Sequence, residues 1–140
     1  MKKTSSYHIL RIGLGLTFLW IGILILQDPF YWGGFIKPWA ADLIPGTIKN
    51  AMISTAILDL AVGVVLLVDY KTWVAALIGS AHILIVLITV GIDAITVRDL
   101  GLLAGTISIL WDDLPARHKQ AISEAKLLEN KKTATPTRMS

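Results

Sequence analysis

Three ionisable residues interrupt long apolar stretches of the sequence, and their chemistry decides what the chain can do. Arg11 lies near the start of one stretch, Asp59 lies in the middle of a second, and His82 lies within a third. A charged carboxyl group in hydrocarbon costs several kcal/mol, so such a group faces protein and has a partner. A carboxyl group beside an imidazole can exchange a proton and can hydrogen-bond the polar part of a ligand.

The positions of Asp59 and His82 predict that the two side chains lie at the same depth. Residues 52–68 are apolar apart from Asp59, and at about 1.5 Å per residue this helix spans roughly 25 Å, close to the apolar thickness of a bilayer. A short turn at 69–71 joins it to an antiparallel apolar stretch. Asp59 lies nine residues before Val68, the end of one span, and His82 lies nine residues after Trp73, the start of the next. We therefore expect Asp59 to contact His82, or Arg11, whose long side chain can reach inward.

A second polar pair, Arg98 and Asp99, begins the last apolar stretch and is expected near the opposite face of the membrane from Arg11. Two interpretations of all these groups remain open. In the first, they are ion pairs that fix the register of the helices. In the second, they form a site for a lipophilic molecule with a polar head, such as a quinone, which needs a donor at each carbonyl and a path for protons. The candidate ligand-binding residues are Arg11, Asp59, His82, Arg98 and Asp99.

Other chemistry has no residues to carry it. The sequence contains no cysteine, which excludes thiolate catalysis, disulfide exchange and cysteine-ligated metal centres within the chain. A bis-histidine haem needs two imidazoles within the membrane, and only His82 lies there. Ser80 is two residues from His82 and on another face of the helix, so it is not a nucleophile activated by that imidazole. We assign no catalytic residue, no metal site and no cofactor within the chain, and a quinone is the candidate ligand.

The composition predicts an all-α membrane protein. Of 140 residues, 54% are hydrophobic and 16% are charged, which is too apolar for an ordinary soluble domain. Four spans are expected in one antiparallel four-helix transmembrane domain over residues 1–114: about 9–26, 52–68, 73–90 and 95–111. The apolar part of the last span, 100–111, is short, so a re-entrant half-span is the alternative. The first span is of full length and contains Arg11, so we interpret it as a retained helix and not a signal peptide.

The segments outside the spans have distinct compositions. Residues 27–50 are rich in aromatic residues and proline, which is typical of an interfacial loop with one short turn. The alternative is a lid over the opening through which a lipophilic ligand passes. Residues 115–130 predict a polar cytoplasmic helix, and residues 131–140 a disordered tail.

The basic residues predict the orientation of the chain. With four spans both termini share one side, and that side holds ten lysines and arginines against three on the other. This bias places both termini in the cytoplasm of a multi-pass protein. The net charge of +3 is not accompanied by a basic-aromatic motif, so nucleic acid is not expected as a partner. The ten basic residues on the side of the termini are Lys2, Lys3, Arg11, Lys71, Arg117, Lys119, Lys126, Lys131, Lys132 and Arg138. The three on the other side are Lys37, Lys49 and Arg98.

Small residues at helical spacing predict where the helices approach closely. Gly15 and Gly22 lie on one face of the first span, and Gly101 and Gly105 lie one turn apart in the last. Because lipid provides no hydrophobic drive between helices, such positions favour close packing of a compact bundle.

Three stretches resemble the DoxX family of small four-helix integral membrane proteins. They are RIGLGLTFLWIG at 11–22, the acidic residue Asp59 midway along the second span, and VRDLGLLAG at 97–105. The resemblance covers residues 9–111. The family usually has Glu in the second span and Lys after the last glycine of the first; here Asp59 takes the former place and residues 23–26 contain no lysine.

The resemblance implies Arg11, Asp59, Arg98 and Asp99 as site positions, whereas His82 rests on the depth argument alone. Some relatives are linked to quinone-dependent oxidation of reduced sulfur compounds, and others to redox-stress membrane complexes. We therefore expect a protein of the prokaryotic cytoplasmic (inner) membrane that is an anchor or quinone-interacting subunit of a redox complex. Its expected partners are the lipid bilayer and a protein subunit or a second copy. The alternative is a non-catalytic assembly subunit whose charges lock the bundle.

Overall fold

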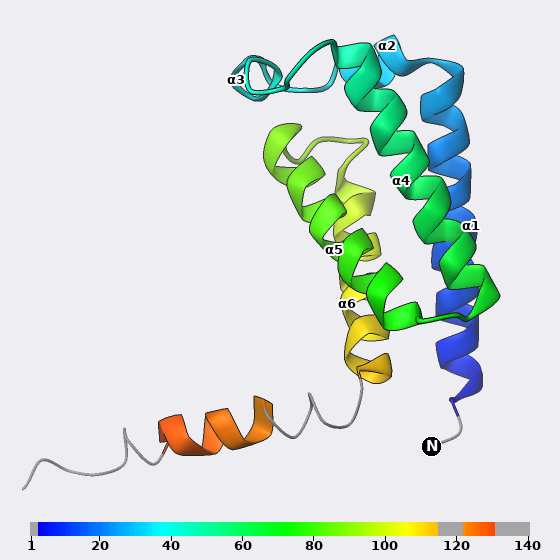
Figure 1. Cartoon of the computed structure of the whole chain (residues 1–140), viewed down its shortest axis with the longest axis vertical. Coiled ribbons are helices and arrows are strands. Elements are labelled where there is room, and N and C mark those ends of the chain that lie inside the picture. Colours follow the sequence, from blue (N-terminus) through cyan, green and yellow to red (C-terminus); the bar gives the residue numbers. More distant parts are fainter. Residues whose placement is uncertain (1–2, 115–121, 131–140) are drawn as a thin grey trace, which may run out of the picture.

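The computed structural model describes residues 3–114 and 122–130, and every regular element in that part of the chain is a helix (Figure 1). A further short helix covers residues 122–130. The labelled helices are α1 (Ser5–Gln27), α2 (Pro29–Gly33), α3 (Pro38–Ala41), α4 (Ile48–Val68), α5 (Thr72–Thr89) and α6 (Val97–Asp113).

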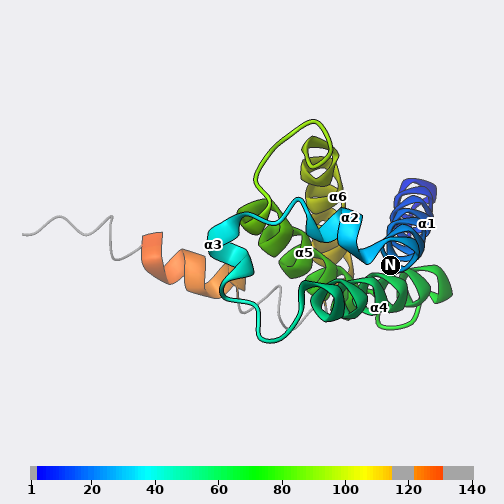
Figure 2. The ribbon, with the colours of Figure 1, turned by 90° about the horizontal axis from the view of Figure 1, so that it is seen from above.

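The four long helices pack as two pairs. α1 lies along α4 and α5 lies along α6, while the contacts between the pairs, α4 with α5 and α1 with α6, are less extensive. Figure 2, viewed from above, shows both pairs end-on, with α2 and α3 at the same end of the bundle. The start of α1 and the end of α6 lie together at the other end, where Lys3 Nζ is 3.0 Å from Asp113 Oδ1.

Local sequence explains where these helices begin and turn. The hydroxyl of Thr4 accepts a hydrogen bond from the backbone N–H of Tyr7, and that of Thr47 caps α4 in the same way. The turn between α4 and α5 has two residues in the left-handed conformation, Asp69 (φ 58°) and Lys71 (φ 44°). The predicted tight turn is therefore confirmed, and it makes α4 and α5 antiparallel.

Within the described residues, three helices are long and apolar enough to cross a membrane: α1, α4 and α5. α1 and α4 contain the first two predicted spans, 9–26 and 52–68, and α5 covers the third, 73–90, except for its last residue. α6 lies where the fourth was expected, at 95–111, but it has only 17 residues and carries charges at both ends. The chain is an all-helical protein of membrane type with at least these three candidate spans.

Close packing of α1 on α4 depends on glycine. A Cβ atom placed on Gly63 would lie 2.9 Å from the carbonyl oxygen of Gly15 and 2.9 Å from the backbone nitrogen of Leu19. Gly22 faces α4 in the same way, so the predicted glycine face of the first span is confirmed. In the last helix Gly105 packs against α1, whereas Gly101 has open space around it, so only half of that motif packs.

The segment between α1 and α4 contains two short helices, where the sequence predicted one short turn. Gly33 at the end of α2 packs against Ile48 and Met52 of α4, which leaves no room for a side chain. Farther along, the backbone N–H of Lys37 donates to the carbonyl of Thr89 at the end of α5 (3.0 Å). The segment is thereby attached to both helix pairs.

The structure has a helix over 122–130, within the segment 115–130 where the sequence predicts one. Residues 115–121 and the predicted tail at 131–140 lie outside the described residues.

Candidate functional site

A cavity of about 300 Å³ lies inside the bundle at the end covered by α2 and α3. Its walls are mostly apolar side chains from α1, α4, α5 and α6, such as Phe18, Ile25 and Leu102. The polar side chains on its wall include four of the five candidate residues, Asp59, His82, Arg98 and Asp99. Apolar walls with a few convergent polar groups are typical of small-molecule sites.

The deepest polar feature of the cavity is the pair formed by Asp59 of α4 and His82 of α5. The Nε2 atom of His82 lies 3.3 Å from Oδ1 of Asp59, and the two side chains are 14% and 4% exposed. The predicted contact is confirmed. It forms because the short turn between α4 and α5 fixes both residues at equal depth.

This pair is incompletely bonded. Among the described residues, Oδ1 of Asp59 has no hydrogen-bond partner, since the 3.3 Å approach of the imidazole lacks hydrogen-bond geometry. A buried acceptor without a donor costs about 1–3 kcal/mol. Because Asp59 lines the cavity, a molecule bound there that offers a hydroxyl or N–H group to this carboxyl can remove that cost.

Arg98 and Asp99 of α6 line the same cavity and do not form a separate group. The Nε atom of Arg98 is 3.5 Å from Oδ1 of Asp99, and its guanidinium carbon lies 5.9 Å from the ring centroid of Trp32. The Arg98 side chain is 48% exposed, while that of Asp99 is 12% exposed. Asp99 therefore faces the interior, and Arg98 lies at the rim beside an aromatic ring.

Arg11 lies elsewhere, so the envisaged cluster of Arg11 with Asp59 and His82 does not form. Its Nη1 atom donates to the carbonyl oxygens of Leu66 and, at 3.0 Å, Leu67. The last carbonyls of a helix have no partner within the helix, so a buried guanidinium at this level binds them. Asp59 is about two turns, roughly 10 Å, farther along α4, which is too deep for Arg11 to reach as well.

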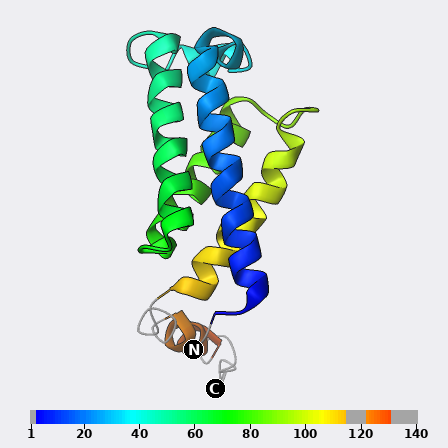
Figure 3. The same ribbon diagram turned by 90° about the vertical axis from the view of Figure 1, so that its right-hand side faces the viewer.

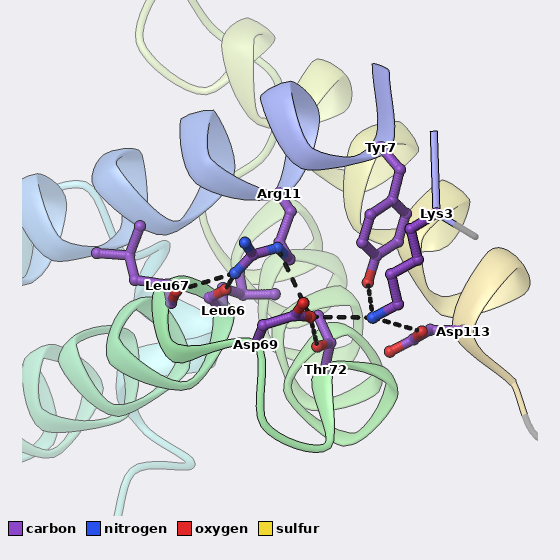
Figure 4. A network of polar contacts seen from close by, with 8 residues as sticks. All are labelled: Lys3, Tyr7, Arg11, Leu66, Leu67, Asp69, Thr72 and Asp113. Carbon is purple, nitrogen blue, oxygen red and sulfur yellow. Dashed lines mark hydrogen bonds and ion pairs between the residues drawn. The ribbon is translucent and has the colours of Figure 1, made fainter. Parts of the chain in front are cut away.

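Arg11 belongs to a polar network at the end of the bundle opposite the cavity (Figure 4). At its centre, Lys3 Nζ lies 2.9 Å from Asp69 Oδ1, 3.0 Å from Asp113 Oδ1 and 3.1 Å from the hydroxyl of Tyr7. The hydroxyl of Thr72 also donates to Asp69 (2.9 Å). Partial burial raises the pKa of Asp69, but the hydrogen bonds from Lys3 and Thr72 outweigh it, so that the pKa lies below its usual value. The ionised carboxylate joins the N-terminal segment to the turn between α4 and α5.

The segment between α1 and α4 covers the cavity. Trp32, Phe35 and Ile36, with Ala40 and Ile44, contribute to its wall. Two aromatic side chains that the sequence placed in an interfacial loop, Trp32 and Phe35, thus face an internal space, as the lid alternative requires. The other three, Phe30, Tyr31 and Trp39, are exposed, as expected for an interfacial loop. The sequence gives no signal for the threonines of the wall, which are Thr55, Thr89 and Thr96. A lone hydroxyl in an apolar helix usually bonds its own backbone, as that of Thr89 does here.

The cavity can hydrogen-bond an uncharged polar head and surround it with apolar atoms. Within residues 3–114 and 122–130, no three His, Asp or Glu side chains are close enough together to hold a metal ion. Comparison of the chain with protein-family models, with curated proteins and with solved structures gives no match.

Proposed function

We propose that this chain is a four-span membrane protein whose internal cavity binds a lipophilic molecule with a small polar head, of the quinone class. The observation that carries the proposal is the unbonded Oδ1 of Asp59 beside His82 on the wall of an apolar cavity. Of the five candidate residues, four line this cavity.

Quinones match the hydrogen-bonding groups of the pair. The hydroxyl of a hydroquinone donates to the Asp59 carboxyl, which lacks a donor. The carbonyl of the oxidised form accepts a hydrogen bond from His82 when Nε2 carries the proton. A carboxyl and an imidazole in contact can also take up and pass on the protons that quinone chemistry requires.

The biological setting extends the resemblance to the DoxX family. The proposal is an anchor or quinone-interacting subunit of a redox complex in a prokaryotic inner membrane, with a partner subunit or a second copy supplying the rest of the assembly. The sequence has no cysteine, so this chain brings no thiolate-ligated centre to such a complex.

The alternative is a non-catalytic assembly subunit, and one observation favours it. The network around Lys3 and Asp69 joins the N-terminal segment, the α4–α5 turn and the end of α6 without facing the cavity. Charges of this kind hold a bundle together, and under this alternative the pair of Asp59 and His82 has the same role between α4 and α5.

Substitution of the pair distinguishes these functions. His82→Ala is expected to weaken binding of decyl-benzoquinone by about tenfold, because a quinone carbonyl loses its hydrogen-bond donor. Asp59→Leu is expected to weaken binding of the reduced form, decyl-hydroquinone, to a similar extent, because a hydroxyl of that form loses its acceptor. Binding is measured by titration of the purified protein in mild detergent. Ser54→Ala in α4 and Leu84→Ala in α5 are the controls, since both side chains are exposed and face away from the cavity.

The thermal stability of each variant completes that experiment. If Asp59→Leu binds decyl-hydroquinone and His82→Ala binds decyl-benzoquinone as tightly as the unchanged protein, and both variants fold normally, the proposed site is wrong. If both variants fail to insert or assemble, the assembly role is the better account.

The fourth crossing has its own test. If α6 crosses the membrane, a reporter fused after Ser140 is on the same side as the N-terminus, and the excess of basic residues puts that side in the cytoplasm. We expect a green fluorescent protein fusion at Ser140 to fluoresce and an alkaline phosphatase fusion there to be inactive. Fusions after Asp93 should give the opposite pattern. A periplasmic signal at Ser140 would indicate three crossings and would overturn the topology.

A further inference from the structure

Ile21 of α1 and Arg98 of α6 line both the cavity and a shallow groove on the outer face of α1. We propose that the cavity opens to the bilayer at this place, between α1 and α6, that a quinone-like ligand enters there, and that its hydrocarbon tail lies along the outer face of α1. This inference rests on the proposed function and adds the route of access and the place of the tail.

The end of the cavity is closed by the segment that contains α2 and α3. Aromatic side chains of this segment line the cavity, Gly33 packs tightly on α4, and Lys37 is hydrogen-bonded to the end of α5. A ligand that enters by this end has to detach the segment from both helices. Entry between two long helices requires no such change.

α1 and α6 are in contact at one end and separate at the other. Gly105 of α6 faces Leu14 and Leu10 of α1, so that a Cβ there would lie 3.2 Å from a Leu14 methyl carbon. Figure 3 shows α6 passing behind α1 and leaning away from it toward the end where α2 lies. The cavity lies at that open end.

The cavity and the outer face of α1 share lining residues where α1 and α6 diverge. A shallow groove on the outer face is lined by Leu16, Thr17, Trp20 and Leu24 of α1, and it shares two residues, Ile21 and Arg98, with the cavity. These two side chains therefore lie between the cavity and the groove. Arg98 is half-exposed there and paired with Asp99, so the rim of the opening is polar while the groove beyond it is apolar.

The size of the cavity requires a place outside it for a tail. About 300 Å³ is at the lower limit for ligand pockets, enough for a ring with its oxygens but not for a long hydrocarbon chain in addition. The groove on α1 is continuous with the cavity and faces away from the bundle core. It provides an apolar surface on which the tail remains in contact with lipid.

Photolabelling locates the ring and the tail separately. Two forms of decyl-benzoquinone are used with the full chain in lipid nanodiscs, one with an azide on the ring and one with an azide at the end of the tail. The ring form is expected to label the cavity near Asp59 and His82, and the tail form is expected to label Leu16, Thr17 or Trp20. Peptide mass spectrometry locates both labels.

Each other outcome has a definite meaning. Tail labels on Ala51, Thr55 or Ile85, which line the cavity between α4 and α5, would overturn the opening between α1 and α6 and leave the proposed function standing. If the ring form labels no cavity residue that unlabelled quinone can protect, the proposed function fails and this inference fails with it.

A variant that narrows the opening gives a second measurement. Ile21→Trp is expected to slow association of decyl-benzoquinone by about tenfold, because access then depends on movement of a larger side chain. Ile12→Trp is the matched control, since Ile12 is an exposed residue of the same helix that lines neither the cavity nor the groove. An unchanged association rate in a folded Ile21→Trp protein would contradict the proposed route.

Discussion

Gly63→Val is expected to force α1 and α4 apart and to destabilise the bundle by about 3 kcal/mol or more, the upper range for overpacking a tight contact. The first atom of the new side chain would lie 2.9 Å from the carbonyl oxygen of Gly15 and from the backbone nitrogen of Leu19. Backbone atoms cannot rotate away as a side chain can, so relief requires the helices to separate. Unfolding in increasing concentrations of dodecyl sulfate, followed by circular dichroism, measures the loss.

The matched control is the same exchange at Gly101 in α6, where an added Cβ meets no atom within 4 Å. Gly101→Val is expected to change stability by less than about 1 kcal/mol, since it alters only local helix propensity. If the two valine variants prove equally stable, the close approach of α1 and α4 is not a major source of stability. That result would also remove the explanation for the glycines on the facing side of α1.

The sequence predicts the long helices well because their signal is local. Apolar runs of nearly membrane length identify α1, α4 and α5, and a left-handed turn at 69–71 joins two of them. α6 is harder to assign, because its charged ends leave a short apolar centre. Gly63 was not recognised as a packing position, since it has no small neighbour one turn away and its partner, Gly15, lies on another helix.

At the site, too, the features set by local sequence were predicted, and those set by contacts between distant helices were not. The contact of Asp59 with His82 follows from a short turn that fixes the two depths, and it was predicted. Arg98 and Asp99 line the same cavity as that pair because of the way α6 leans across the bundle, and no local sequence pattern specifies this. The partners of Arg11 were missed because they are backbone carbonyls, and every helix ends with such groups whatever its sequence.

Arg11→Met is expected to destabilise the protein by about 3 kcal/mol, the range for removing one partner from a buried charged contact. Methionine retains much of the apolar length of the side chain but has no donors. The carbonyls of Leu66 and Leu67 then lose their guanidinium partner, and Asp69 loses the nearby cation, whose Nε lies 3.7 Å from its carboxylate. The stability of Arg11→Lys should lie between those of the unchanged protein and Arg11→Met, because an ammonium group retains the charge but not the planar fork of donors.

Arg98→Met is the control for a loss of charge alone. Its side chain is 48% exposed, against 8% for that of Arg11, so we expect a loss of less than about 1 kcal/mol, as for exposed ion pairs. The same dodecyl sulfate titration measures all three variants, and equal losses for Arg11→Met and Arg98→Met would contradict the role given to the buried guanidinium.

Quinone affinity measured on the folded fraction then separates the two polar clusters. Arg11→Met should leave it unchanged, because Arg11 does not line the cavity, whereas His82→Ala should lower it. A loss of affinity in Arg11→Met would mean that the network at the α4–α5 turn also shapes the cavity, since the same turn sets the relative depth of Asp59 and His82.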